Sequence, residues 1–325
     1  MAKTAVATAL LFERDSVDEI EDWTEGVPSL GRSSVLWIDL ERPDEAEVER
    51  LIELLDLDRA TATCLSEEPE EPCLFDRGDY LEVTARAPAD DGGRELTAVR
   101  CLVAERWVVT VHDGPVEVLD TFRARASGSG DTGRLEGPEF LANLLEWVLS
   151  SYFEAFERIE LALEDIDTTS MGGDVDGREE ALRRLVEIRR EIGRLRRALA
   201  AHRELILALT RPELDAITSS KSAQRFANLR DRLEDAIAAA RDSRESVVGS
   251  FDVLIASTNQ RTNEIMKVLT LASVLILPGT LLAGILGMNF KVGIFEHDAY
   301  FWVALATIVS VALVTLLAAR VRHWI

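Results

Sequence analysis

The chain has 325 residues, of which 47% are hydrophobic, and a formal net charge of −22 at pH 7. This length and apolar content support about two domains with a sizeable core and exclude a disordered chain. The acidic balance argues against nucleic acid, because a protein that neutralises phosphates needs a basic face; cations are the more natural partner. Cys64, Cys73 and Cys101 are odd in number and widely spaced, which predicts neither a disulfide framework nor a zinc knuckle.

Residues 1–130 alternate strand and helix patterns and predict an α/β or α+β domain in a reducing cytoplasm. The N-terminal apolar run ends at Glu13, too early for a signal peptide, and predicts a first strand. Further strands are predicted at 33–41 and 80–89, a helix at 42–58, and a hairpin at 95–115 that is followed by a helix.

Enzymatic chemistry finds no support in this sequence. No glycine-rich phosphate loop or nucleophile elbow interrupts the strands and helices. The histidines are scattered along the chain, so no nucleophile, base and orienter can be assembled from them. We therefore expect a protein that is not an enzyme and has no bound cofactor. The four histidines are His112, His202, His297 and His323.

Long helices are predicted after the first domain. A helical hairpin is expected within 131–212, turning at Gly172-Gly173. No proline then appears before Pro278, and apolar residues keep a helical spacing, which predicts one helix from about residue 213 into the membrane. This helix would have ~75 residues and measure ~110 Å at 1.5 Å per residue. A helix of that length is not stable alone in water, so it must be bundled, most simply with copies of itself.

Two long segments without a charge, 268–288 and 299–319, lie near the C-terminus. Each matches the ~20 residues that cross a bilayer core as a helix. Buried helices of a soluble core are the alternative, but such helices rarely run this long without a polar face. Basic residues, among them Lys267 and Arg320, precede the first segment and follow the second, which places both termini in the cytoplasm.

One face of the first predicted span carries every hydroxyl between Lys267 and Asn289. Such a face suits the lining of a pore. Small residues on a stripe also serve helix packing in membranes with no pore, so both interpretations stay open at this point. Steps of three and four residues give the stripe Asn263, Met266, Thr270, Ser273, Leu277, Thr280, Gly284 and Gly287.

The segment TNEIMKVLTLASVLILPGTLLAGILGMNF (262–290) is followed by a short loop, a second span and a basic C-terminus. It closely resembles the CorA-type divalent-cation transporters, whose signature is Gly-Met-Asn at the end of the first of two C-terminal spans. LVAERWVVTVHDGP is similar to a hairpin common in the cytoplasmic domain of that family. The resemblance implies an α+β membrane protein: a funnel-shaped homopentamer with long stalk helices and five first spans around an axial pore. It also implies transport of divalent metal ions across the cell membrane, of Mg²⁺ first, with Co²⁺ or Ni²⁺ as further passengers.

The resemblance also assigns roles to individual residues, which are carried over position by position. The filter falls on Gly287, Met288 and Asn289, with Asn289 as the ring that faces hydrated ions. The pore-lining positions are Thr280, Leu277, Ser273 and Asn263, and the hydrophobic gate is formed by Leu269 and Met266. Leu269 lies one residue off the stripe described above, so the rotation of the helix there stays open.

The sequence departs from the family in the loop after the filter. Magnesium transporters of the family commonly have Met-Pro-Glu-Leu there, whereas this chain has KVGIFEHD. Glu296 and Asp298 could still concentrate cations at the entrance, although an ordinary solvated loop explains them equally well.

A second departure concerns regulation. In magnesium-gated members an acidic stalk residue pairs with an acid of the neighbouring α/β domain, but the stalk position here is Asn228. Asp231, with Asp90 or Asp91, is the remaining candidate set for a regulatory metal ion. A proton-coupled Zn²⁺ transporter is therefore one alternative function. A non-conducting, membrane-anchored cytoplasmic sensor or scaffold is another.

The expected partners are divalent metal ions, the lipid bilayer and further copies of the chain, but no nucleic acid. The predicted layout is a cytoplasmic α/β domain (1–130), a helical hairpin (131–212), a stalk helix (213–267), a pore-lining span (268–289), an extracytoplasmic loop (290–298), a second span (299–319) and a cytoplasmic tail (320–325).

Overall fold

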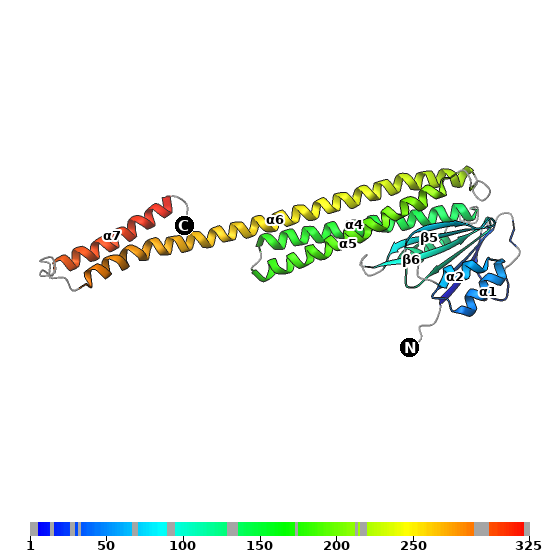
Figure 1. The fold of residues 1–325 in the computed structure, drawn as a ribbon, viewed down its shortest axis with the longest axis horizontal. Coiled ribbons are helices and arrows are strands. Elements are labelled where there is room, and N and C mark those ends of the chain that lie inside the picture. Colours follow the sequence, from blue (N-terminus) through cyan, green and yellow to red (C-terminus); the bar gives the residue numbers. More distant parts are fainter. Residues whose placement is uncertain are drawn as a thin grey trace. The chain divides into compact units, whose positions relative to one another are not determined.

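The protein is represented by a computed structural model, drawn as a ribbon in Figure 1. The chain divides into two compact units, Met1–Phe251 and Asp252–Ile325, which are described separately. The structure describes residues 6–13, 16–26, 30–31, 34–66, 71–89, 95–128, 136–172, 175–211, 214, 220–288 and 299–321.

The first unit contains a seven-stranded sheet with the order β2-β1-β3-β7-β6-β5-β4. Neighbouring strands are antiparallel except for β3 and β7, which are parallel. These two strands are buried along nearly their whole length, as is usual where helices cover both faces of a sheet. The strands are β1 (Val6–Phe12), β2 (Val17–Glu19), β3 (Val35–Glu41), β4 (Cys73–Asp76), β5 (Leu81–Pro88), β6 (Leu96–Val103) and β7 (Trp107–His112).

One face of the sheet is covered by α1 (Glu45–Leu55) and α2 (Arg59–Ser66) (Figure 1). Asp44 starts α1 with a capping box, in which its carboxylate accepts from the Glu47 N–H at 2.8 Å and the Glu47 carboxylate accepts from the Asp44 N–H at 2.9 Å. The predicted helix at 42–58 is thus confirmed with shorter ends, and α2 follows it unpredicted. Leu51 of α1 belongs to the core cluster that also contains Leu36, Ile38 and Leu40 of β3.

The opposite face of the sheet packs against α3 (Glu117–Gly128) and α4 (Gly137–Gly172). Because side chains alternate along a strand, Trp37 of β3 points to this face. Its ring lies 5.5 Å from that of Phe122 in α3 and 5.4 Å from that of Phe140 in α4, centroid to centroid. An aromatic core therefore joins both helices to the centre of the sheet.

The predicted hairpin is confirmed by β6 and β7, which turn at Glu105-Arg106. Gly137 at the start of α4 donates its N–H to Glu105 O at 2.8 Å. A Cβ atom at Gly137 would lie 1.8 Å from Ala104 O, so only glycine allows the helix to begin against this turn.

The predicted helical hairpin is confirmed by α4 and α5 (Val175–Leu209), which lie side by side with Arg184 Nη1 3.3 Å from Asp165 Oδ2. The predicted long helix is α6 (Ser220–Leu286), of 67 residues. It begins later than residue 213, because the chain first makes a short turn in which Leu214 N–H donates to Arg211 O. The last helix is α7 (Ala299–Val321), of 23 residues.

His202 of α5 joins the helical hairpin to the edge of the sheet. The short β4 pairs with Leu81–Thr84 of β5, and Arg86 lies two residues beyond this paired stretch. His202 Nε2 accepts from the Arg86 N–H at 3.1 Å, and the hydroxyl of Tyr152 donates to Arg86 O at 2.7 Å. His202 Nδ1 donates to Ala198 O at 2.7 Å, which fixes the neutral tautomer. Burial lowers the pKa of His202 to about 4.

Acid is therefore expected to destabilise this unit through His202. In the unfolded chain the ring protonates near pH 6.5, whereas in the folded chain it stays neutral down to about pH 4. Its contribution is present above pH 6.5 and is lost as the pH falls, by about 3 kcal/mol in total. In His202→Leu the thermal unfolding temperature should depend less on pH between pH 6.5 and 4 than it does in the wild type. An equally steep curve in the variant would contradict this role.

Candidate ion pathway

The second unit contains the apolar end of α6 and the whole of α7. Within the described residues, one helix is long and apolar enough to cross a membrane: the Lys221–Ile285 part of α6, whose most apolar window has a mean hydropathy of 2.2 and no buried residue. α7 contributes a shorter apolar stretch, Leu305–Val321.

α7 packs against one face of α6. The residues of this face are half-buried, and a Cβ atom at Gly279 would lie 3.4 Å from Ile308 Cγ2 of α7. Gly279 thus lets the two helices approach closely, as small residues do between membrane helices. The half-buried residues of α6 are Leu271, Leu275, Pro278, Gly279 and Leu282.

The predicted pore stripe lies off this contact. Its side chains are exposed in the single chain; Leu269 is 58% exposed and Leu277 is 70% exposed. An apolar face this open needs lipid or other copies of α6 to cover it. The exposed stripe comprises the predicted stripe residues Asn263, Met266, Thr270, Ser273, Leu277 and Thr280, together with Leu269, which lies one residue off the predicted stripe.

The hydroxyls of the stripe are bonded within the helix. Thr270 donates to Met266 O at 2.7 Å, Ser273 to Leu269 O at 2.9 Å, and Thr280 to Ile276 O at 3.0 Å. Each hydroxyl uses its only hydrogen in this bond and keeps oxygen lone pairs free to accept. These side chains can therefore receive hydrogen bonds from the water shell of a cation.

Pro278 adds a further acceptor, which the sequence reasoning did not identify. A proline inside a helix has no N–H for the carbonyl four residues earlier. That carbonyl belongs to Val274, next to Ser273 on the stripe. The proline in the middle of the span was the available signal.

α6 ends at the predicted filter. Gly287 N–H donates to Ala283 O at 2.9 Å, and Met288 N–H donates to Ile285 O at 3.2 Å, in the last turn. A Cβ atom at Gly287 would lie 3.1 Å from Ala283 O, so a larger residue would crowd this turn. The predicted site residues Asn289, Glu296, Asp298, Asp90 and Asp91 lie outside the described residues.

The proposed gate residue Leu269 lies in a groove of about 490 Å³ on α6. Arg261 and Glu264 at one end of the groove form an ion pair with an N–O distance of 3.1 Å. The remaining lining residues, Ile265, Val268, Leu269 and Ala272, are apolar.

The surroundings of Asn228, in the first unit, are cationic. A cavity of about 220 Å³ between α4 and α6 is lined by Asn228, Arg225, Arg232, Asn143 and Glu146, together with Ala142 and Leu229. Arg225 donates to Asn143 Oδ1 at 2.6 Å, and Arg232 donates to Ser150 Oγ at 3.1 Å. Sequence reasoning missed these arginines, although their spacing of three and four residues from Asn228 places them on one helix face.

Asp231, the described member of the predicted regulatory set, is exposed, and its Oδ1 lies 3.5 Å from Arg230 Nη2. Among the residues that the structure describes, no three His, Cys, Asp or Glu side chains are grouped so that they could hold a metal ion.

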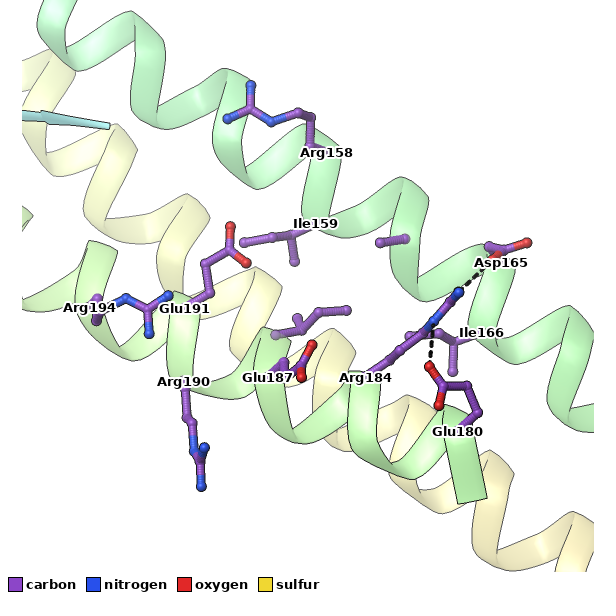
Figure 2. A pocket seen from close by; sticks show the side chains of 12 residues that line it. Arg158, Ile159, Asp165, Ile166, Glu180, Arg184, Glu187, Arg190, Glu191 and Arg194 are labelled. Atoms are coloured by element: carbon purple, nitrogen blue, oxygen red, sulfur yellow. Dashed lines mark hydrogen bonds and ion pairs between the residues drawn. The ribbon is translucent and has the colours of Figure 1, made fainter. Parts of the chain in front are cut away.

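A larger cavity, of about 740 Å³, lies between α4 and α5 (Figure 2). At one end Arg184 lies between Asp165 and Glu180, with N–O distances of 3.3 and 3.5 Å. The lining carries equal numbers of basic and acidic residues, so the cavity offers no net negative charge to a cation. The charged residues are Arg158, Arg184, Arg190, Arg194, Asp165, Glu180, Glu187 and Glu191.

The chain is similar in sequence to known metal-ion transport proteins. The Cobalt/magnesium transport protein CorA of Methanocaldococcus jannaschii is 22% identical over 294 residues, covering 90% of this chain and 92% of that protein. The Magnesium transport protein CorA of Haemophilus influenzae is 24% identical over 301 residues, covering 90% and 93%. These relatives are transport proteins and not enzymes.

The fold is also that of a solved transporter. The complete structure of the CorA magnesium transporter from Methanocaldococcus jannaschii matches with a TM-score of 0.79 and 20% identity, covering 100% of both chains. The family model described as "CorA-like Mg2+ transporter protein" matches residues 32–321. Because this match spans most of its length, the chain belongs to the family of CorA-like Mg²⁺ transporter proteins.

Proposed function

We propose that this chain assembles in the cell membrane as a homopentamer whose axial pore conducts divalent cations, Mg²⁺ first, with Co²⁺ and Ni²⁺ as further passengers. The observation that carries the proposal is the exposed stripe of α6, whose hydroxyl hydrogens are all used within the helix. Family membership and the names of the relatives support the same activity. Copies of α6 side by side would cover the apolar surface that one chain leaves open.

The proposed layout follows the sequence. Residues 213–267 form the stalk, 268–289 the pore-lining span, 290–298 an extracytoplasmic loop and 299–319 a second span. The domain of residues 1–130 and the tail of residues 320–325 then lie in the cytoplasm, in accord with the basic residues that flank the spans.

Selectivity is assigned to a ring of Asn289 side chains beside Gly287 and Met288. Magnesium gives up its inner waters reluctantly and usually keeps several of them when bound. Neutral amide oxygens accept hydrogen bonds from those waters without holding the ion as tightly as carboxylates would. The negative end of the helix dipole of α6 also favours a cation at this mouth.

Further roles are proposed for other residues of the pathway. Leu269 and Met266 form the narrow apolar constriction, and Asn263, Ser273, Leu277 and Thr280 line the pore on either side of it. Glu296 and Asp298 attract cations to the entrance. Asp231 with Asp90 or Asp91 is retained for a regulatory ion, although Arg225 and Arg232 oppose a cation near Asn228.

The proposal is tested by flux into liposomes that contain the purified protein. We expect Mg²⁺, Co²⁺ and Ni²⁺ to enter without an imposed proton gradient. Zn²⁺ flux that requires a proton gradient would instead identify a proton-coupled Zn²⁺ transporter. The absence of flux for all four ions would overturn transport and leave a membrane-anchored sensor or scaffold. Empty liposomes provide the background.

A further inference from the structure

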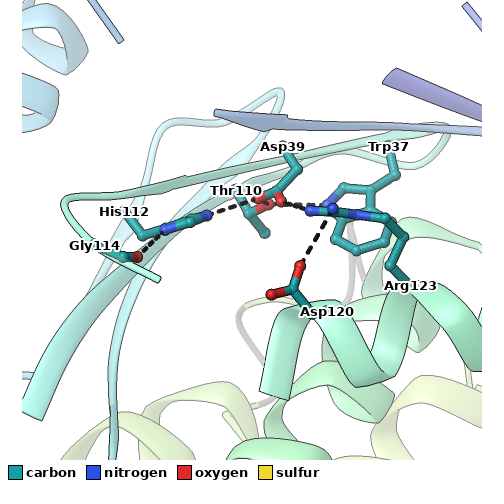
Figure 3. Close-up of polar contacts among 7 residues, drawn as sticks. All are labelled: Trp37, Asp39, Thr110, His112, Gly114, Asp120 and Arg123. Carbon is teal, nitrogen blue, oxygen red and sulfur yellow. Dashed lines mark hydrogen bonds and ion pairs between the residues drawn. The ribbon is translucent and has the colours of Figure 1, made fainter. Parts of the chain in front are cut away.

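A buried charged network lies at the carboxyl ends of the parallel strands β3 and β7 (Figure 3). Asp39 of β3 and His112 of β7 are only 4% and 5% exposed. Arg123 of α3 donates to Asp39 Oδ2, and the Thr110 hydroxyl donates to Asp39 Oδ1. Trp37 Nε1 in turn donates to Thr110 Oγ1 at 2.9 Å, which fixes the direction of the Thr110 hydrogen. The Asp39 carboxylate is therefore held by two elements besides its own strand.

The ring of His112 lies between two acceptors. Nδ1 is 2.5 Å from Gly114 O, and because a carbonyl can only accept, Nδ1 carries a hydrogen. Nε2 is buried without a hydrogen-bond partner among the described residues and lies within ion-pair distance of Asp39 Oδ1, at 3.4 Å. A neutral imidazole with its hydrogen on Nδ1 would direct the lone pair of Nε2 at this carboxylate. Only the doubly protonated ring satisfies both neighbours.

Charged groups surround His112 from every element that packs here. Burial, the largest single effect, lowers the pKa of His112, but the hydrogen bond and charge of Asp39 and the Gly114 carbonyl outweigh it, so the pKa lies above its ordinary value. The groups are Asp39 and Glu41 of β3, Arg123 and Asp120 of α3, Arg100 of β6, and Arg42 and Asp113 in the loops after β3 and β7.

We propose that His112 is a pH-sensitive lock in this domain: its second proton bridges the end of β7 to the Asp39 carboxylate of β3, and the loss of that proton breaks this bridge. When the proton leaves to solvent, the lone pair of Nε2 faces the carboxylate, and Asp39 keeps only Arg123 and Thr110. The lock is closed in acidic and neutral solution and opens as the solution becomes alkaline. This inference does not depend on the proposed ion conduction.

Proton linkage sets the direction in which pH changes the stability of this domain. The folded-state pKa of His112 is raised above the unfolded value of 6.5. The stabilisation by this proton is therefore fully present below pH 6.5 and is lost as the pH rises through the folded-state value. The contribution of His202 to stability is lost as the pH falls below 6.5, so the effects of the two histidines occur in different pH ranges.

The direct test is an NMR titration of the full-length protein in detergent micelles with isotope-labelled histidine. The chain has four histidines, and the signal lost in His112→Gln identifies His112. We expect its midpoint to lie above pH 6.5. Arg123→Gln should raise the midpoint further, by about one unit, because it removes a like charge and leaves Asp39 to His112 alone. Asp39→Asn should lower the midpoint below 6.5.

Asp120→Asn is the matched control, since Asp120 is 65% exposed and pairs with Arg123 rather than with His112. Its midpoint should stay near that of the wild type. A purely structural histidine would not show opposite shifts in Arg123→Gln and Asp39→Asn. A midpoint at or below 6.5 in the wild type, or one that neither variant moves, would overturn the proposal.

Thermal unfolding gives an independent readout. The unfolding temperature of the wild type should exceed that of His112→Gln most at pH 6, and the difference should shrink by several degrees towards pH 9. A constant difference across this range would contradict a titrating lock. Where His112→Gln does not fold, the wild type is compared with Arg123→Gln instead. Because His112 keeps its proton to a higher pH in that variant, the fall of its unfolding temperature should extend to a higher pH than in the wild type.

Discussion

Asn289→Ala should reduce divalent-cation flux in liposomes by at least about tenfold, to the level of empty vesicles. The variant removes every amide acceptor from the proposed ring. Hydrogen bonds of this kind contribute about 0.5–1.5 kcal/mol each, and 1.4 kcal/mol already corresponds to a factor of about ten. The measurement is initial Mg²⁺ uptake at matched amounts of reconstituted protein.

Asn228→Ala is the matched control for this prediction, because it makes the same chemical change on the same helix, in the unit that holds the sheet. It should conduct at a rate close to that of the wild type. If Asn289→Ala also conducted normally, the filter would have to lie elsewhere, even though the transport proposal itself could stand.

Leu269→Asn should increase the flux, by roughly tenfold. A ring of leucines makes a constriction that water wets poorly. Asparagine is of similar size, and its amide would hold water in the constriction. Initial uptake of Mg²⁺ and of Co²⁺ would both be measured, since wetting should help each ion.

Val268→Asn provides the comparison for the gate. Val268 is 69% exposed and precedes Leu269, but it lies off the stripe. It should leave the flux nearly unchanged. An increase with Val268→Asn in place of Leu269→Asn would show that α6 is rotated by about one residue relative to the proposed pore.

The elements that the sequence predicts correctly are those with a local pattern. The helix predicted at 42–58, the hairpin at Glu105-Arg106 and the helical periodicity of α6 all depend on residues a few positions apart. The order of the strands does not follow from such patterns. β3 pairs with β7, which lies about 70 residues later in the chain, and this non-local pairing gives the parallel pair among the described strands.

The functional residues likewise fall into those that a local pattern predicts and those that depend on a partner distant in sequence. The stripe follows from periodicity within one helix, so it could be predicted from the sequence, and its role in a pore stays a prediction. His112 was only one scattered histidine in the sequence, because its partner Asp39 belongs to a distant strand. The available signal was an aspartate inside the apolar run VLWIDL. A charged residue in a buried strand needs a partner, but the sequence does not say which one.

The internal bonds of the hydroxyls on α6 have a consequence for the sign of the permeating charge. Thr270, Ser273 and Thr280 spend their hydrogens on carbonyls of their own helix. Along this stretch of the proposed pore, chloride or phosphate would find hydroxyl oxygen lone pairs and no hydroxyl hydrogen to bind. Anions would thus lose hydration without compensation. Discrimination between anions and cations can therefore arise in a stretch of helix that contains no charged residue.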